Sequence, residues 1–377
     1  MIAILFILLL YALLIGWLLS GWMKLRSGCP LSDKPLTTIS LLIPARNEQE
    51  NISLLLEDIQ HQDYPMDLLE IIVIDDHSED QTAILADSFI PEMKYKMRVI
   101  RVTGATSGKK NALHMGVSAA MGELIITTDA DCRAGPAWIR SIASCYEQVH
   151  PQMILGPVRY SKSNTLCGWL QELEFMSLQF TTAGSAGMEN PLLANGANLT
   201  FNRKAYDACG GYRENSSFAS GDDMFLLSGI KRKFGKTSIY YLKSAKAIVT
   251  TDPESTLKGF VSQRLRWVSK TRGYNDWFLL SVSALVYLIN LVIFISLIAG
   301  MFSYMARWIA LVLLAFKMLI DLPSIITTTR FFQRMQLIWL LPVLELVNSI
   351  YTSCIGLAGN LVAFRWKGRR FNPGIRK

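Results

Sequence analysis

The sequence predicts an α/β protein with a mostly parallel sheet, flanked at both ends by membrane-spanning segments. Short apolar runs alternate with helix-forming segments between Thr38 and Thr250. One uninterrupted apolar stretch precedes this part, and others follow it. The 377-residue chain is 51% hydrophobic and only 18% charged, with a mean hydropathy of +0.27, which is typical of a membrane protein.

The first apolar stretch, Ile2 to Met23, is long enough to cross a bilayer. A signal peptide is the alternative, but no basic region precedes the stretch and no small-residue cleavage site follows it. Lys24 and Arg26 come next, and basic residues stay on the cytosolic side of a membrane. We therefore expect residues 1–24 to be an anchor whose N-terminus lies outside.

A cytosolic domain is expected over residues 37–250. Strands are predicted at 38–43, 70–75, 97–102 and 123–129, and helices at 48–61, 79–89, 109–121 and 136–149. Strands that alternate with helices in this way favour a parallel sheet. The carboxyl ends of parallel strands share one edge, and ligands bind there.

An interfacial segment is expected at 251–277 and about three transmembrane helices at 278–364. The apolar runs of that region lie at 278–300, 304–321 and 336–364. The third run is too long for one simple span. The basic tail, 365–377, favours the cytosolic side, whereas four crossings would put it outside. Either one segment re-enters or lies in the interface, or the long one crosses twice.

The charge pattern points to a membrane surface. The net charge of +8 comes from 38 basic and 30 acidic residues, and the basic residues cluster beside the apolar segments. Anionic lipids attract such clusters, and no zinc-finger or RNA-binding signature is present. Membrane lipids are therefore expected partners and nucleic acid is not. The six cysteines are scattered and the four histidines lack metal-site spacing, which indicates reduced thiols and no zinc site.

The stretch LIITTDADC (124–132) ends a β-branched run in two aspartates, Asp129 and Asp131. Carboxylates so close together repel each other, and burying either one without a partner is costly. A cation removes both costs, and hard divalent ions prefer carboxylate oxygens. The pair therefore predicts a site for a hard divalent cation.

Further charged motifs follow in a fixed order. PARNE (44–48) comes after the first strand and DDHSED (75–80) after the second, while SGDD (220–223) and QRLRW (263–267) come later. Each alone is weak, because charged loops are usually solvated. GATSGKK (104–110) is not a P-loop, since its spacing is one residue short and a lysine stands where Ser or Thr should be.

Together these motifs resemble the family 2 glycosyltransferases, in particular the membrane-embedded branch related to cellulose, hyaluronan and ceramide-glucosyl synthases. The resemblance covers roughly residues 38–267. It implies a GT-A fold, a Rossmann-like α/β domain, together with a nucleotide-sugar donor and a divalent metal ion. SGDD departs from the TED form of cellulose synthases and matches the GDD form of hyaluronan synthases.

The resemblance and the charge pattern suggest roles for single residues. Asp223 is the expected general base, with Asp222 as its alternative, and Arg266 stabilises the leaving diphosphate. As the resemblance implies, Asp129 and Asp131 hold Mg²⁺ or Mn²⁺ against the diphosphate. The expected donor contacts are Pro44, Arg46, Glu48, Asp75, Asp76, Lys109, Lys110, Asp129, Asp131, Gln263 and Arg266. The expected acceptor contacts are Asn195, Gly196, Asp222 and Trp267.

Several of these residues also have a purely structural interpretation. Asp75 or Asp80 can cap the helix that begins near Glu79. The QRLRW segment can form an amphipathic interfacial helix. NGAN (195–198) can be a tight turn, and 167–180 has the pattern of a packed amphipathic helix.

The expected activity is direct, inverting transfer of a sugar to a lipid-linked or membrane-associated acceptor. The enzyme would be a multi-pass protein of the cell (inner) membrane with a cytosolic catalytic domain. UDP is expected as the donor nucleotide by analogy only. A processive polysaccharide synthase is the alternative; it needs more helices than one chain supplies, which homo-oligomerisation would provide. A non-catalytic nucleotide-sugar-binding relative would be expected to have lost the base or the metal pair, and this sequence retains both. The apolar segments carry few ionisable residues, which argues against a transporter.

Overall fold

The computed structural model describes residues 2–103, 108–212, 221–269, 273, 276–358, 364–366 and 369–371. The chain divides into two compact units. We call Met1–Trp22, Lys162–Gly184 and Pro253–Lys377 the helical unit, and Met23–Ser161 with Ser185–Asp252 the sheet unit.

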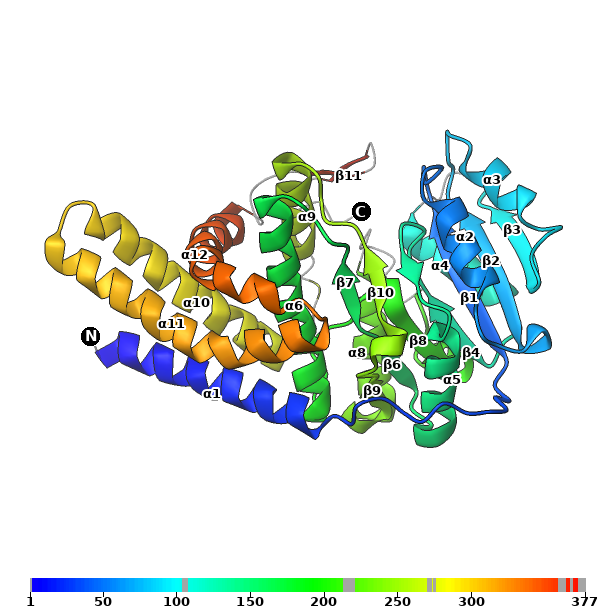
Figure 1. Cartoon of the computed structure of the whole chain (residues 1–377), viewed down its shortest axis with the longest axis horizontal. Coiled ribbons are helices and arrows are strands. Elements are labelled where there is room, and N and C mark those ends of the chain that lie inside the picture. The colour runs from blue at the N-terminus through cyan, green and yellow to red at the C-terminus, as the bar shows by residue number, and fades with distance from the viewer. Residues whose placement is uncertain are drawn as a thin grey trace. The chain divides into compact units, whose positions relative to one another are not determined.

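The described part of the sheet unit forms a seven-stranded sheet in the order β3-β2-β1-β4-β8-β6-β9 (Figure 1). The first four strands in this order are parallel, β8 is antiparallel to both of its neighbours, and β6 and β9 are parallel. The mostly parallel sheet predicted from the sequence is therefore confirmed. The strands are β1 Ile39–Ala45, β2 Leu69–Asp75, β3 Lys96–Arg101, β4 Leu124–Thr127, β6 Met153–Leu155, β8 Leu199–Asn202 and β9 Ile239–Tyr241.

A smaller sheet has the order β5-β10-β7. Its strands are β5 Arg133–Ala134, β7 Val158–Tyr160 and β10 Val249–Thr251. The helices of the sheet unit are α2 Ile52–Gln60, α3 Thr82–Ser88, α4 Lys109–Ala119, α5 Trp138–Val149, α7 Arg203–Ala208 and α8 Asp222–Phe234. Short 3₁₀ turns complete the unit at η1 Met66–Leu68, η2 Gly196–Asn198, η3 Lys236–Ser238 and η4 Ala245–Ala247.

All four predicted strands and all four predicted helices are present, but α2 and α3 begin three to four residues later than predicted. Before α2, the carbonyl oxygen of Glu48 accepts hydrogen bonds from the amides of Asn51 (3.0 Å) and Ile52 (2.9 Å), which makes a turn. Before α3, Asp80 Oδ1 accepts the amide of Thr82 (3.0 Å). Polar side chains favour turns at such positions, so helical periodicity alone placed both starts too early.

The core of the sheet unit lies on both faces of the central strands. In β1, β2 and β4 nearly every residue is buried, because helices or loops cover both sides of a parallel sheet. Helix α4 packs closely on this sheet at Gly116. A Cβ there would lie only 2.9 Å from Ile74 Cδ1, so a larger residue would have to displace the end of the Ile74 side chain.

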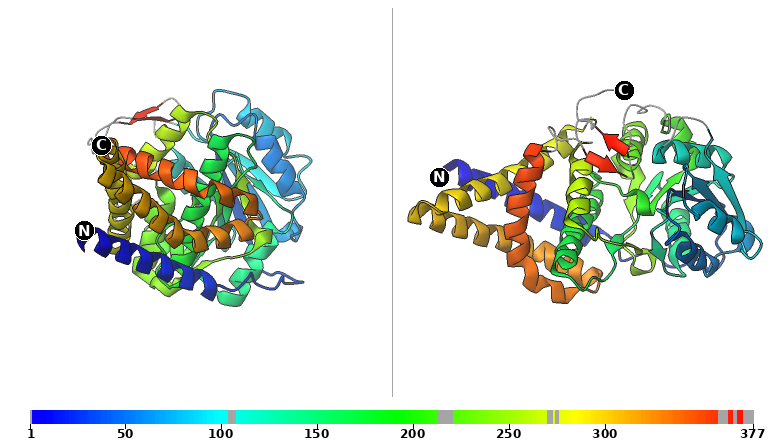
Figure 2. Two further views of the ribbon diagram at one scale, coloured as in Figure 1. Left: turned by 60° about the vertical axis from the view of Figure 1, so that its left-hand side comes forward. Right: turned by 90° about the horizontal axis from the view of Figure 1, so that it is seen from above.

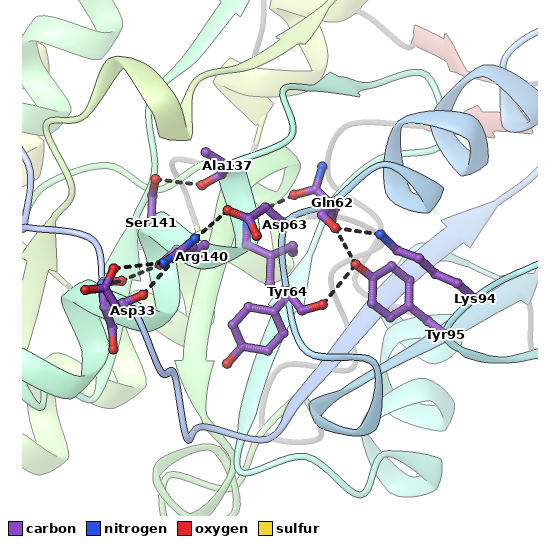
Figure 3. A network of polar contacts seen from close by, with 12 residues as sticks. Asp33, Gln62, Asp63, Tyr64, Lys94, Tyr95, Ala137, Arg140 and Ser141 are labelled. Carbon is purple, nitrogen blue, oxygen red and sulfur yellow. Dashed lines mark hydrogen bonds and ion pairs between the residues drawn. The ribbon is translucent and has the colours of Figure 1, made fainter.

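A polar network closes the amino ends of β1, β2 and β3 (Figure 3). Arg140 of α5 pairs with Asp63 (Nη1–Oδ2, 2.6 Å) and with Asp33 (Nη2–Oδ1, 3.4 Å). The carbonyl oxygen of Gln62 accepts a hydrogen bond from the hydroxyl of Tyr95 (2.6 Å). Asp33 precedes β1, Gln62 and Asp63 precede β2, and Tyr95 precedes β3 in the chain. The network therefore fixes the edge of the sheet opposite to the carboxyl ends.

The described part of the helical unit contains four helices long and apolar enough to cross a membrane, one N-terminal and three C-terminal. Figure 2 shows α1, α10 and α11 from two further sides. Side chains of these three helices form one apolar core cluster. The elements of the unit are α1 Ile2–Lys24, α6 Leu166–Gly187, α9 Leu257–Ser269, α10 Trp277–Gly300, α11 Tyr304–Phe331, η6 Met335–Leu340, α12 Leu341–Ala358, β11 Phe364–Trp366 and β12 Arg369–Phe371.

Two of the C-terminal segments differ from their prediction. Helix α11 runs ten residues beyond the predicted end at Asp321. It continues through Pro323, since transmembrane helices tolerate proline. The long third segment forms a single candidate span, Met335–Ala358, within the described residues. Most of the basic tail, 365–377, lies outside the described residues, and both alternatives for its side of the membrane stay open.

A cluster of ionisable side chains is buried among α1, α11 and α12. Lys317 Nζ donates to Asp321 Oδ2 (2.8 Å) and forms an ion pair with Glu345. The hydroxyl of Tyr11 donates to Asp321 Oδ1 (2.7 Å). All four side chains are 7% exposed or less. One lysine therefore compensates two buried carboxylates and ties three helices together.

Replacing Lys317 by Met is expected to destabilise the helical unit strongly, because it leaves Asp321 and Glu345 buried without their cation. The expected loss is about 3 kcal/mol or more. Glu345→Gln is the matched control, since it leaves the Lys317–Asp321 pair intact and should cost clearly less. Thermal unfolding of the full chain in detergent measures both variants. Equal losses would contradict the proposed charge balance.

Candidate active site

Acidic residues follow two strands at the carboxyl edge of the main sheet. β2 ends at Asp75 and β4 at Thr127, and both strands pair in parallel with β1. Asp76 directly follows β2, while Asp129 and Asp131 follow β4. Because the carboxyl ends of parallel strands meet at one edge, these four carboxylates lie along the same side of the sheet.

The PARNE residues link the ends of β1 and β2 to the following helices. Pro44 lies in β1 beyond the point where its pairing with β4 stops, so no ladder bond to β4 is lost. Arg46 Nη1 donates to the carbonyl oxygen of Asp76 (3.5 Å). The amide of Glu48 donates to Oγ1 of the first residue of α3 (2.7 Å). These contacts hold the loop at the edge where the strands end.

Asp75 and Asp76 are both buried, at 6% and 5% exposure. Asp76 Oδ1 lies 3.1 Å from Nδ1 of His77. Asp75 Oδ1 has no hydrogen-bond partner among the described groups. A buried carboxylate oxygen without a donor is costly, so this atom is suited to receive a donor group from a ligand. Of the two aspartates that were candidates to cap this helix, it is Asp80 that accepts the backbone amide at the start of α3.

The two aspartates after β4 differ in their contacts. Asp129 forms an ion pair with Lys109, the first residue of α4. Asp131 Oδ2 accepts a hydrogen bond from Oγ1 of Thr251 at the end of β10 (3.3 Å). Asp129 is therefore paired with a cation, and Asp131 is anchored to the small sheet. The preceding residues of the GATSGKK motif, 104–107, lie outside the described residues.

Helix α8 brings two further carboxylates to this edge. It begins with Asp222 and Asp223, after Gly221 with φ +96°. That backbone conformation favours glycine, and the N-terminus of a helix favours negative charge. The amide of Gly196 donates to Asp223 Oδ2 (3.4 Å). Ser220, the first residue of the SGDD motif, lies outside the described residues.

The surroundings of Gly196 show that Lys109, Asp222 and Asp223 lie close together. A Cβ at this position would lie 3.3 Å from Lys109 Nζ, 3.7 Å from Asp222 Oδ2 and 4.0 Å from Asp223 Cβ. Together with the ion pair to Asp129, this places one lysine among three carboxylates. We call Lys109, Asp129, Asp222 and Asp223 the acid–lysine cluster.

The electrostatics of the cluster favour a charged Lys109. Burial acts to lower the pKa of Lys109, but the carboxylates of Asp129, Asp222 and Asp223 outweigh it, so the pKa is raised above its usual range. Lys110 lies in a different setting. Its Nζ stands 5.3 Å from the ring centre of Phe225, and burial lowers its pKa. The carboxylate of Asp222 acts in the opposite direction on Lys110, but burial outweighs it.

Asn195 and Gly196 form the tight turn that the NGAN pattern suggested. Asn195 Oδ1 accepts the amide of Ala197 (3.0 Å) and thereby caps η2. Thr127, which the sequence did not single out, donates from Oγ1 to the carbonyl oxygen of Gly196 (3.0 Å). This bond attaches the turn to the end of β4. It explains how a segment about 70 residues further along the chain reaches the edge at Asp129.

The described residues contain no group of three or more His, Cys, Asp or Glu side chains suited to hold a metal ion alone. Asp129 and Asp131 offer two carboxylates, separated by Ala130. Mg²⁺ is commonly held by one or two carboxylates together with substrate phosphates and water. The pair therefore fits a divalent ion that arrives with a diphosphate.

The QRLRW residues belong to the helical unit, where they lie on α9. The first arginine of this motif was overlooked in the sequence. Arg264 is only 4% exposed, pairs with Glu174, and lies over the ring of Trp267. The sequence did contain a sign of such a buried arginine, because two glutamates inside the apolar pattern of 167–180 require cationic partners.

Comparison with solved structures identifies the fold. Over 93% of its length, the chain is similar to the solved structure of a mannosyltransferase from Pyrobaculum calidifontis, with a TM-score of 0.58, 16% sequence identity and 97% of that structure covered. At this identity the similarity shows the fold alone. The sheet unit is a GT-A-like α/β domain, as expected from the sequence.

Residues 40–210 match the model of the Glycosyl transferase family 2. The chain therefore carries a family 2 glycosyltransferase domain.

Several characterised or named proteins are similar in sequence to parts of this chain. A β-monoglucosyldiacylglycerol synthase from Trichormus variabilis is 28% identical over 199 residues, which are 51% of this chain and 41% of that protein. A probable glycosyltransferase from Bacillus subtilis is 37% identical over 99 residues, which are 26% of this chain and 24% of that protein. The matches thus span less than half the length of these relatives.

Replacing Lys109 by Met is expected to destabilise the sheet unit near pH 7, because three carboxylates then lose their shared cation. The expected loss is about 2 kcal/mol, or roughly 4–8 °C in melting temperature. Because the pKa of Lys109 is raised on folding, this contribution is present below the unfolded pKa of about 10.4 and disappears as the pH rises through the higher folded pKa.

The neighbouring variant Lys110→Met serves as the control, because burial opposes the charge of Lys110. Thermal unfolding of both variants in detergent at pH 7 measures the difference. A melting temperature of Lys109→Met equal to or above that of Lys110→Met would contradict the charge balance of the acid–lysine cluster.

Proposed function

We propose that this protein is an inverting glycosyltransferase that moves a sugar from a nucleotide-sugar donor to a lipid-linked or membrane-associated acceptor. The observation that carries the proposal is the acid–lysine cluster at the carboxyl edge of a family 2 domain. It combines carboxylates for a metal ion and for proton transfer with a lysine suited to a diphosphate. A cluster of this composition has the chemistry that sugar transfer from a nucleotide requires.

We assign the donor to the ends of β1, β2 and β4. Asp76 would accept a hydrogen bond from a base or ribose. Asp75 would support it, because its buried Oδ1 has no partner among the described residues. Arg46 and the two lysines of α4 would contact the diphosphate. Pro44 and Glu48 would shape the loop around the nucleotide. UDP remains the proposed nucleotide by analogy.

Asp129 and Asp131 would hold Mg²⁺ or Mn²⁺ together with the donor phosphates. When bound, the ion supplies positive charge to the leaving diphosphate. Lys109 lies next to Asp129 and can stabilise the same phosphate oxygens. Arg266 is proposed to contribute a further positive charge to the diphosphate, and Gln263 a donor contact.

Asp223 is proposed as the general base. Its carboxylate would take the proton from the acceptor hydroxyl while the hydroxyl oxygen bonds to C1 of the sugar. The bond between C1 and the diphosphate oxygen then breaks on the opposite side, so the anomeric configuration inverts. The hydrogen bond from Gly196 to Oδ2 fixes the orientation of the carboxylate. Asp222 is the alternative base, and Asn195, Gly196 and Trp267 would contact the acceptor.

A lipid acceptor fits the four candidate membrane spans. It is also supported by the name of the Trichormus relative, a monoglucosyldiacylglycerol synthase. We place the protein in the cell (inner) membrane, with the sheet unit in the cytosol, where nucleotide sugars are made. The QRLRW motif favours a processive polysaccharide synthase as the second candidate, and such a synthase would require a homo-oligomer to form a channel.

Release of nucleoside diphosphate from a panel of nucleotide sugars tests the proposal. The full chain in detergent is expected to release diphosphate from one donor when Mn²⁺ or Mg²⁺ and membrane lipid extract are present. EDTA should abolish the release, because it removes the divalent ion that Asp129 and Asp131 would hold against the leaving diphosphate. No release from any donor, with either ion and with lipid, would contradict the proposed activity.

Asp223→Asn is expected to lower the rate of transfer by about 10²–10⁴-fold, because the amide cannot take the proton of the acceptor. The KM for the donor should change little. Asp80→Asn is the matched control, since it removes a carboxylate that caps α3 at the same edge of the sheet. Steady-state kinetics with the donor that the wild type uses measure both variants. Equal rates for Asp223→Asn and wild type would exclude Asp223 as the base.

A further inference from the structure

We propose that Arg264 is a positioning residue that fixes the side chains of Gln263 and Trp267 on α9. This inference rests on the proposed function, in which these two residues contact donor and acceptor. Arg264 itself stands at an unassigned position between them. Its guanidinium is buried, yet it contacts both neighbours directly.

The contacts of Arg264 use both the edge and the face of its planar side chain. Along the edge, Nε donates to Glu174 Oε1 (3.1 Å), and Nη2 donates to the other oxygen of the same carboxylate. Nη1 donates to Gln263 Oε1 (2.5 Å). The guanidinium carbon lies 4.1 Å from the ring centre of Trp267 and 4.6 Å from that of Phe260. One side chain thus orients the amide of Gln263 and the indole of Trp267.

Arg264 is in turn held by α6, and α12 supports this contact. Glu174 lies on α6 and also accepts a hydrogen bond from the hydroxyl of Tyr351 on α12. Gln263 receives further support, because its Nε2 donates to Glu254 Oε1 (3.4 Å). The backbone of Glu254 is paired with the side-chain amide of Gln171 on α6 (2.9 and 3.1 Å). The position of α9 side chains is therefore set by α6 and α12.

Only arginine can make this set of contacts. A bidentate bond to Glu174, a third bond to Gln263 and stacking on Trp267 require a planar group with several donors in a fixed arrangement. Lysine keeps the charge and can still pair with Glu174. It lacks the flat guanidinium that covers the indole, so Trp267 loses its neighbour while the buried carboxylate keeps its cation.

Helix α6 also carries a second buried glutamate that pairs with an arginine, and this pair serves as a control. Glu172 of α6 is 1% exposed and pairs with Arg334 through Nε (2.5 Å) and Nη2 (2.8 Å). This pair has the same chemistry and similar burial as Glu174 and Arg264. The guanidinium of Arg334 donates these two hydrogen bonds to Glu172, and neither goes to a side chain of α9. Arg334→Lys therefore controls for the cost of weakening a buried arginine–glutamate pair.

The first experiment compares Arg264→Lys and Arg334→Lys in the full chain, with the donor and lipid acceptor to which the wild type responds. Arg264→Lys is expected to raise the KM for the acceptor about tenfold, since the cation–π contact that orients Trp267 is lost. Arg334→Lys should leave that KM within about twofold of wild type. Similar KM changes in both variants, or in neither, would overturn the inference.

The second measurement does not depend on activity. Acrylamide quenching of tryptophan fluorescence is compared with and without Trp267→Phe, and the difference reports Trp267 among the nine tryptophans. In the Arg264→Lys background the Trp267 signal should become about twofold more quenchable, because the guanidinium no longer covers the ring. In the Arg334→Lys background it should not change. Unchanged quenching in Arg264→Lys would overturn the positioning role.

The two measurements separate the inference from the function on which it rests. If the wild type transfers no sugar but Trp267 becomes accessible in Arg264→Lys, the proposed function fails and the positioning contact stands. If the wild type is active and neither KM nor quenching changes in Arg264→Lys, the positioning role fails and the proposed function stands.

Discussion

Carboxylates that need cationic partners, half-buried in the sheet unit and buried in the helical unit, shape this protein. In the sheet unit, Lys109 compensates the aspartates that β4 and α8 bring to the carboxyl edge. In the helical unit, Glu172 and Glu174 of α6 face buried arginines, and Lys317 joins two further acids. An unpaired charge in an apolar interior costs several kcal/mol, so each acid restricts where its partner helix or strand can lie. The acids of the sheet unit are also the groups that we assign to chemistry.

The parallel sheet explains why residues far apart in the sequence form one site. Parallel order places the ends of β1, β2 and β4 at the same edge, so Asp76 and Asp129 lie along one edge of the fold although many positions separate them in the chain. Gly196 and Asp223 reach this edge through β8 and α8. The bond from Thr127 to the turn at Gly196 then connects both halves of the sheet unit. The opposite edge is closed by the network around Arg140.

The helical unit is more than a set of membrane anchors. Helix α6 carries two glutamates that pair with Arg264 on α9 and with Arg334 beside η6. Through these pairs the apolar helices are connected to the QRLRW segment. If Arg264 positions Trp267 as we propose, membrane helices determine the geometry of an acceptor contact. This would link the place of the protein in the membrane to its choice of acceptor.

The sequence by itself determined the α/β class, the four apolar segments and the acidic ends of β2 and β4, because these depend on local periodicity and on residue type. It placed the starts of α2 and α3 too early, since the turns before them depend on hydrogen bonds to neighbouring residues. It also ended α11 too early, at Asp321, since whether a helix continues through Pro323 depends on the helices around it. It also passed over Arg264 and Thr127. Only the tertiary structure decided those partners, because a buried ion pair or a stacked ring joins residues whose separation along the chain carries no pattern.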